Sequence, residues 1–184
     1  MDKRHYKYRD GAIIGDGIRY VEAVDGVAIR EVTEVGDILI GSNIKYPGWS
    51  MMLSEGDSDY DSIEEVEAIE KSEFNRVWRR LLESNMGRWA FTKAAYTIGA
   101  RVGGHLVVFY PQGAIVDFGD GALGVADYGA CKASTEWQNM YPGHRVTAVV
   151  AGYDEDNQWV LVAQPQVHSE SKDMHPDIEY PSPR

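Results

Sequence analysis

Three aspartates recur at every second position in Asp57-x-Asp59-x-Asp61, the spacing with which a calcium loop of the EF-hand type begins. Such a loop needs glycine at its sixth position and a bidentate glutamate at its twelfth, and here these are Ser62 and Ala68. The pattern therefore predicts a solvated acidic loop rather than a metal site. Carboxylates in such a loop can dock a basic protein partner, so the three aspartates are candidate docking residues.

Charge is distributed unevenly along the first half of the chain. Carboxylates follow one another at short intervals from Ser54 to Glu73. The amino terminus is instead basic, and its Lys and Arg side chains are interleaved with His5, Tyr6 and Tyr8. Basic segments with aromatics can grip nucleic acid, but a terminus of this kind can equally be frayed. Both interpretations stay open.

The chain shows no pattern of catalytic residues. Its five histidines have no metal-ligand spacing, and Cys131 is the single cysteine, so an internal disulfide or a thiolate metal cage is excluded. We expect Cys131 to be a buried small side chain. No lysine-bearing helix follows either Gly-Asp-Gly turn, and no nucleophile motif is present. The sequence predicts a non-enzymatic binding protein without metal or cofactor.

Length and composition are those of a globular protein. The 184 residues are 43% hydrophobic and 11% aromatic, enough for one ordinary domain or two small ones. The net charge of −11 is unusual for a nucleic-acid binder, although charges can segregate on a folded surface. No apolar run is long enough to span a membrane, and the amino terminus lacks a signal-peptide pattern. We therefore expect a cytoplasmic protein with no membrane contact.

The first ninety residues predict a β-meander followed by helix. Asp25-Gly26 separates two strand-like runs, 18–24 and 27–33, and this dipeptide favours a type I′ hairpin. A third short strand is expected at 38–40. Residues 74–82 place their apolar side chains on one helical stripe, with Ser72 as the expected N-cap. A second helix is expected at 89–95, while residues 63–69 fit either a helical turn or a strand that pairs with the meander.

Residues 96–165 have the pattern of short strands separated by glycine turns. Apolar residues alternate with others, as they do in half-buried strands. Asp154-Glu155-Asp156-Asn157 is a polar turn between the last two strands, and residues 130–141 suit a short helix or loop. Glycines stand where the strands of a small barrel must bend: Gly99, Gly104, Gly113, Gly119, Gly124 and Gly143.

This order of strands, turns and glycines resembles the RNA-binding OB-fold domain named after ribosomal protein S-one. The resemblance covers about seventy of the 184 residues. It implies a five-stranded barrel that binds single-stranded RNA on one face, through stacking aromatics and basic side chains. It does not cover the N-terminal half.

Several positions depart from that family. Gln112 and Ile115 stand in place of aromatics, Asp127 in place of a histidine and Trp159 in place of a basic residue. A carboxylate repels phosphate, so Asp127 is instead a fourth candidate docking residue. The candidate RNA contacts are Tyr110 and Trp159 as stacking rings, Gln112 and His105 as polar groups, and Arg101 and Arg145 as cations.

The sequence thus predicts an α+β protein in three parts. A β-meander with one or two helices occupies residues 1–93, an S-one-like OB barrel 94–165 and a disordered tail 166–184. Two functions stay open. The first is weak contact with single-stranded RNA or a ribonucleoprotein. The second is protein docking, in which the barrel has lost its RNA face and the acidic surface meets a basic partner.

Overall fold

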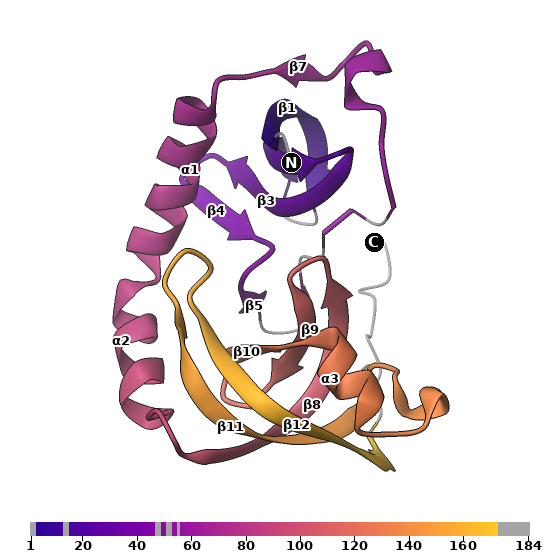
Figure 1. The fold of residues 1–184 in the computed structure, drawn as a ribbon. Helices are drawn as coiled ribbons and strands as arrows, with labels where there is room; N and C mark the ends of the chain where they lie inside the picture. The colour runs from indigo at the N-terminus through magenta and orange to yellow at the C-terminus, as the bar shows by residue number, and fades with distance from the viewer. Residues whose placement is uncertain (1–2, 13–14, 47–48, 51–52, 55, 173–184) are drawn as a thin grey trace, which may run out of the picture.

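The chain folds into two five-stranded sheets flanked by helices (Figure 1). This computed structural model describes residues 3–12, 15–46, 49–50, 53–54 and 56–172. β5 (Lys45–Tyr46) and β6 (Trp49–Ser50) form a small two-stranded sheet. The α+β class expected from the sequence is confirmed. Every helix in the described part of the chain is too short or too polar to cross a bilayer.

The N-terminal sheet contains the predicted meander. Its strands lie in the order β4-β3-β2-β1-β7. The Asp25-Gly26 hairpin is confirmed, since the two turn residues have φ of 50° and 81°, as a type I′ turn requires. The strands are β1 (Lys3–Ala12), β2 (Gly15–Val24), β3 (Val27–Val35), β4 (Ile38–Gly41) and β7 (Glu67–Ala68).

The basic amino terminus is a strand in this sheet, neither frayed nor a free arm. β1 pairs with β2 along its whole length and with β7 on its other side. Its cations are held by the acidic stretch: Arg4 pairs with Asp61, and Lys7 with Glu67 and Glu73. Of residues 63–69, only Glu67–Ala68 form the strand that pairs with the meander, while residues 64–65 form a turn.

Two consecutive helices run along one side of both sheets (Figure 1). α1 (Lys71–Ser84) buries the predicted apolar stripe, with Phe74, Val77, Trp78 and Leu81 packed on the N-terminal sheet. Ser72 is not its N-cap. The cap is Glu70, whose carbonyl accepts the backbone N–H of Glu73 at 2.9 Å, so Ser72 lies within the first turn. α2 (Met86–Ala95) starts three residues before its predicted position.

The C-terminal sheet closes on itself. Each of its five strands has a hydrogen-bonded neighbour on both sides, in the order β10-β12-β11-β8-β9 with β9 returning to β10. β10 and β12 are parallel and the other pairs antiparallel. The strands are β8 (Arg101–Tyr110), β9 (Gly113–Asp117), β10 (Leu123–Ala126), β11 (His144–Asp154) and β12 (Trp159–Ser171); α3 (Tyr128–Ala133) and η2 (Trp137–Asn139) connect β10 to β11.

Two of the predicted bend glycines are required by close backbone contact. A Cβ at Gly104 would lie 2.5 Å from the carbonyl oxygen of Asp117, and one at Gly113 would lie 2.3 Å from that of Ala126. The interior of the closed sheet is filled by aliphatic side chains such as Leu106, and Trp89 of α2 packs against this core. The helix and the sheet therefore share one core.

The predicted tail is wrong for residues 166–171, which continue strand β12. Val167 faces the interior and is buried, and the backbone N–H of Val167 donates to Ser134 Oγ at 3.0 Å. Pro165, which suggested the end of the strand, is therefore tolerated inside it. The rest of the predicted tail, residues 173–184, lies outside the described residues.

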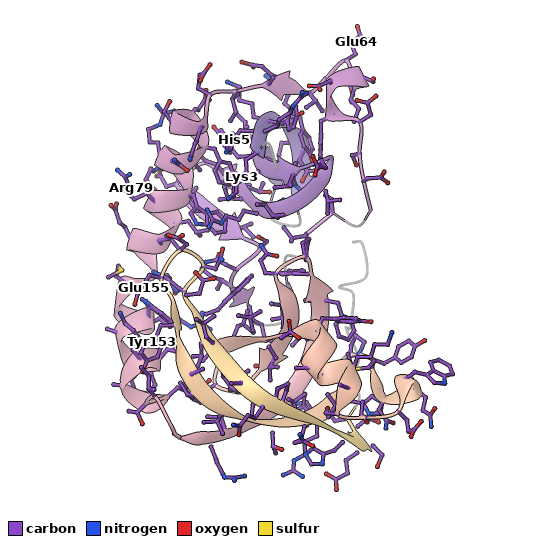
Figure 2. The ribbon with its side chains drawn as sticks, in the orientation of Figure 1. Lys3, His5, Glu64, Arg79, Tyr153 and Glu155 are labelled. Carbon is purple, nitrogen blue, oxygen red and sulfur yellow. The ribbon has the colours of Figure 1, made fainter. Side chains whose placement is uncertain are left out.

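The turn between β11 and β12 joins the closed sheet to the N-terminal half. Trp78 donates its indole N–H to the carbonyl of Asp156 at 2.8 Å, and Trp89 donates to the carboxylate of Glu155 at 2.7 Å. Figure 2 shows Glu155 and Tyr153 lying against the helices. Arg30 of β3 reaches the side chain of Asn157 at 3.1 Å. The polar turn predicted at this place thus serves as an internal joint.

Candidate nucleic-acid interface

Three of the predicted RNA contacts are used inside the protein. Trp159 is 1% exposed, and its indole N–H donates to the carbonyl of Asn43 at 3.0 Å. The Tyr110 hydroxyl donates to the carbonyl of Ser42 at 3.3 Å, and Gln112 donates its amide to the carbonyl of Ile29. These side chains hold the two halves together, so the prediction that they meet a base is wrong for this conformation.

The cause is a segment of the N-terminal half that lies over the outer side of β9 and β10. There Ile115, Leu123, Val125 and Trp159 form an apolar cluster of their own, separate from the interior of the closed sheet. Lys45, beyond the Asn43 contact, forms an ion pair with the buried carboxylate of Asp117. The face on which the S-one resemblance places RNA is therefore covered by residues 42–45.

The other three predicted contacts come together on a face that is open. Arg145 on β11 stands directly opposite His105 on β8, and Arg101 stands opposite Val149 on the same pair of strands. Because side chains two residues apart in a strand share a face, all three point outward. His168 joins them from β12, with its Nε2 2.9 Å from Thr147 Oγ1. With Lys172 just beyond β12, these residues form what we call the cationic face: Arg101, His105, Arg145, His168 and Lys172.

The cationic face is accessible and locally positive. β8, β11 and β12 sweep across the end of the molecule remote from the N-terminal sheet (Figure 1). Burial, followed by the charge of Lys172, lowers the pKa of His105; Asp117 opposes this shift and Arg145 adds to it. The carboxylate of Glu170 pairs with Arg145 at 3.0 Å, but both side chains are exposed, so a phosphate can replace it at little cost.

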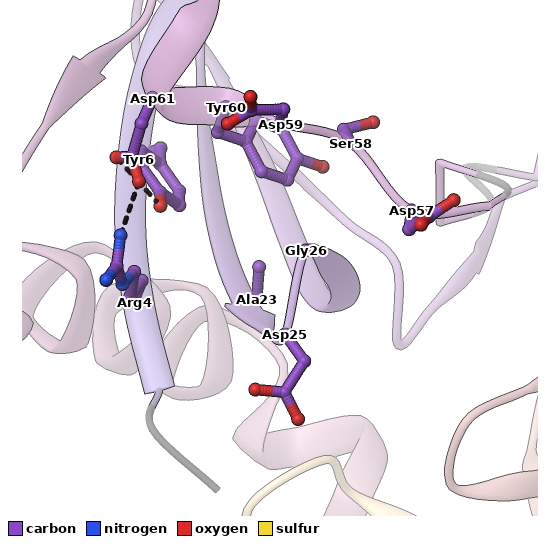
Figure 3. A pocket seen from close by; sticks show the side chains of 10 residues that line it. All are labelled: Arg4, Tyr6, Ala23, Asp25, Gly26, Asp57, Ser58, Asp59, Tyr60 and Asp61. Carbon is purple, nitrogen blue, oxygen red and sulfur yellow. Dashed lines mark hydrogen bonds and ion pairs between the residues drawn. The ribbon is translucent and has the colours of Figure 1, made fainter.

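The predicted docking aspartates line a pocket of the N-terminal half (Figure 3). Asp57, Asp59 and Asp61 surround a volume of about 390 Å³ together with Asp25. Asp61 is already bound by Arg4 and by the hydroxyl of Tyr6. The rings of Tyr6 and Tyr60 stack beside it, 4.8 Å apart, and burial raises the pKa of Tyr60 to about 12. The other lining residues are Ala23, Gly26 and Ser58.

Asp127 does not join this pocket. Its carboxylate accepts the backbone N–H of Ala130 at 2.6 Å and so caps helix α3 on the closed sheet. It has a local structural role as a helix cap, and its part in docking stays a prediction. Among the described residues, no group of three or more His, Cys, Asp or Glu side chains is arranged to hold a metal ion.

Sequence reasoning missed part of the cationic face and the aromatics beside it. His168 and Lys172 fell in the supposed tail, because Pro165 suggested the end of the last strand. Trp137 and Tyr141 fell in a segment read only as a connection, yet they are 69% and 56% exposed. Two large aromatics in a polar connecting segment were the available signal, since such a segment has little core to bury them.

Comparisons with known proteins give no further guide to this site. The chain has no match among protein-family models, curated proteins or solved structures.

Proposed function

We propose that this protein is a non-enzymatic binding protein whose C-terminal half is an S-one-like OB barrel, and that it contacts single-stranded RNA or a ribonucleoprotein. Two features support the fold assignment. The sheet is closed and five-stranded, and its helix-bearing connection stands between the third and fourth strands. Those are features of a Greek-key OB barrel. The proposed contact with RNA depends on one observation, the cationic face.

The cationic face suits a polyanion of modest length. Arg101, Arg145 and Lys172 are permanently charged at neutral pH, and they stand on one surface of a chain whose net charge is −11. Each cation can neutralise one phosphate, which releases its counterions. Three such contacts give weak, salt-sensitive binding with little preference for sequence. RNA would thus bind away from β9 and β10, whose outer side is covered.

The test is an anisotropy titration of a labelled twelve-nucleotide single-stranded RNA at low salt. Each neutralised phosphate on a single strand is expected to contribute about −0.7 to the slope of log K against log salt concentration. Three contacts should therefore give a slope of about −2. Arg101→Ala should make the slope shallower by about 0.7. Arg79→Ala is the matched control, because Arg79 is an exposed arginine on α1 (Figure 2). Absence of saturable binding at tens of micromolar protein would refute the proposal.

A second candidate is docking of a basic protein at the aspartate pocket. The observation in its favour is that Asp25, Asp57 and Asp59 line one hollow of the N-terminal half. A lysine or arginine of a partner would find several carboxylates there. Affinity purification with and without nuclease separates the two functions. A partner that survives nuclease and is lost from Asp57→Asn favours docking, whereas one lost with nuclease favours RNA.

A further inference from the structure

Three large aromatic side chains stand out from the connection between β10 and β11. Trp137 is 69% exposed, Tyr141 56% and Tyr128 45%. Tyr128 has a partner within the protein, since the edge of its ring meets Phe109 at a centroid distance of 5.4 Å. Trp137 and Tyr141 instead present broad ring surfaces to solvent. Large aromatics gathered in this way on a surface commonly mark an interaction site.

Hydrogen bonds order the connection between β10 and β11 that carries these rings, residues 128–143, which we call the platform. Ser134 Oγ donates to the carbonyl of Cys131 at 2.7 Å and accepts the backbone N–H of Val167 at 3.0 Å. Asn139 donates its amide to Thr135 Oγ1 at 2.9 Å, which fixes the turn of η2 that carries Trp137. The exposure is therefore built into the fold, and a ligand that binds these rings would have little backbone to order.

The platform adjoins the cationic face. Tyr141 opens a turn that ends at His144, whose backbone N–H donates to the Tyr141 carbonyl at 3.3 Å. Within this turn Gly143 donates to the carbonyl of Leu106 on β8 and accepts the backbone N–H of Lys172. Tyr141 is thus placed where β8, β11 and the end of β12 meet, next to the cations on those strands.

We infer that Trp137 and Tyr141 form a base-stacking site for the strand whose phosphates lie on the cationic face. The inference rests on the proposed function and names its ligand class: a single strand with unpaired bases, rather than any polyanion. Flat aromatic rings bind the faces of unpaired bases without regard to sequence, whereas a duplex keeps those faces stacked on one another. The site would be distinct from the covered side of β9 and β10.

The test compares two probes of equal charge, a twelve-nucleotide adenosine RNA and an abasic oligomer with the same number of phosphates. The full-length chain should bind the RNA at least tenfold more tightly than the abasic strand. Trp137→Ala should reduce RNA affinity roughly 5- to 100-fold, the range for loss of one stacked base, and leave abasic binding unchanged. Trp137→Phe should retain most of the affinity.

Phe91→Ala is the matched control, because Phe91 is also 69% exposed but lies on α2. It should change neither affinity. Equal binding of both probes, or RNA affinity unaffected by Trp137→Ala and Tyr141→Ala, would overturn the stacking site while leaving RNA binding by the cationic face intact. If neither probe binds at low salt, both proposals are overturned. Unchanged urea midpoints for the variants would exclude unfolding as the cause.

Discussion

The joint between the two halves predicts a large stability effect at Trp159. This side chain is 1% exposed, packs with Tyr110 at a ring-centroid distance of 6.1 Å and donates to the carbonyl of Asn43. Truncating a buried tryptophan to alanine typically costs about 3–5 kcal/mol. Leaving the Asn43 carbonyl without its donor adds about 1 kcal/mol. Trp159→Ala should therefore lower the free energy of unfolding by about 4–6 kcal/mol.

Two further variants separate the contributions. Trp159→Phe keeps most of the apolar contact and loses the hydrogen bond, so it should cost about 1–3 kcal/mol. Trp137→Ala removes the same residue type from an exposed site and should change stability by less than about 0.5 kcal/mol. The contrast between Trp159→Ala and Trp137→Ala reflects the burial and the hydrogen bond of Trp159, because both variants truncate a tryptophan to alanine.

Urea unfolding followed by circular dichroism measures these differences. With a slope of about 2 kcal/mol per molar urea, Trp159→Ala should lower the midpoint by at least about 2 M. A midpoint within error of the wild type would show that Trp159 is not buried at the joint. The covering of β9 and β10 by residues 42–45 would then be wrong, and Trp159 would again be available to a base.

Four further predictions concern single groups. RNA affinity should rise as pH falls below 6.5, the ordinary value for histidine, because a phosphate favours the protonated form of His105, whose pKa is lowered by burial and then by Lys172. His105→Gln should reduce this rise in anisotropy titrations. Because the pKa of His105 is lower in the folded chain, the unfolded chain takes up this proton first as pH falls. The free energy of unfolding should therefore decrease as pH falls through 6.5. Retention of the wild-type pH dependence by His105→Gln in urea titrations would contradict this. The Cys131 thiol, which is buried and whose pKa is raised to about 11 by burial and then by Asp127, should react with a thiol reagent only through opening of the fold; labelling as fast as in denaturant would contradict this. Arg30→Met should cost about 1.5–3 kcal/mol in urea unfolding, because buried Glu22 loses one charged partner and keeps Lys3 and His5. Arg80→Met, which breaks an exposed pair with Glu34, should cost less than about 1 kcal/mol.

Elements with local signals could be predicted from the sequence. Asp25-Gly26 specifies its turn because both residues tolerate positive φ, and the two flanking runs need only each other to pair. The apolar stripe on α1 is likewise specified by the local helical spacing of its residues, and Phe74, Val77 and Trp78 are buried as expected. In both cases the deciding interactions lie within a few residues of one another.

Strand β1 could not be predicted in this way, because its partners are distant in sequence. Lys7 pairs with Glu67 and Glu73, and Arg4 with Asp61, more than fifty residues away. Without those partners, a row of cations and aromatics resembles an arm for nucleic acid. Charge neutralisation between two segments of opposite sign is a tertiary effect that neither segment shows alone.

Only half of the predicted RNA contacts lie on an exposed surface, again because tertiary contacts decide where the others lie. Arg101, His105 and Arg145 lie on the parts of β8 and β11 that are away from the docked N-terminal half, so placing them on these strands was enough. Trp159 and Tyr110 lie where the N-terminal half docks, and the resemblance covers only the C-terminal half. A family pattern predicts the position of a side chain on its own domain, but not what another part of the chain lays over it.

The net charge of −11 does not oppose the proposed site once the charges are placed in space. Asp61, Glu67 and Glu73 of the acidic stretch are paired with β1, and the aspartate pocket belongs to the N-terminal half, whereas the cationic face lies on the remote side of the closed sheet. At physiological salt the screening length is about 8 Å, so distant carboxylates add little to the potential at that face. The local balance therefore decides. There, Glu170 and the buried Asp117, which is itself paired with Lys45, oppose Arg101, Arg145 and Lys172. The carboxylates elsewhere on the protein would instead keep a bound strand at this end of the molecule, because a longer strand would bring its phosphates close to them.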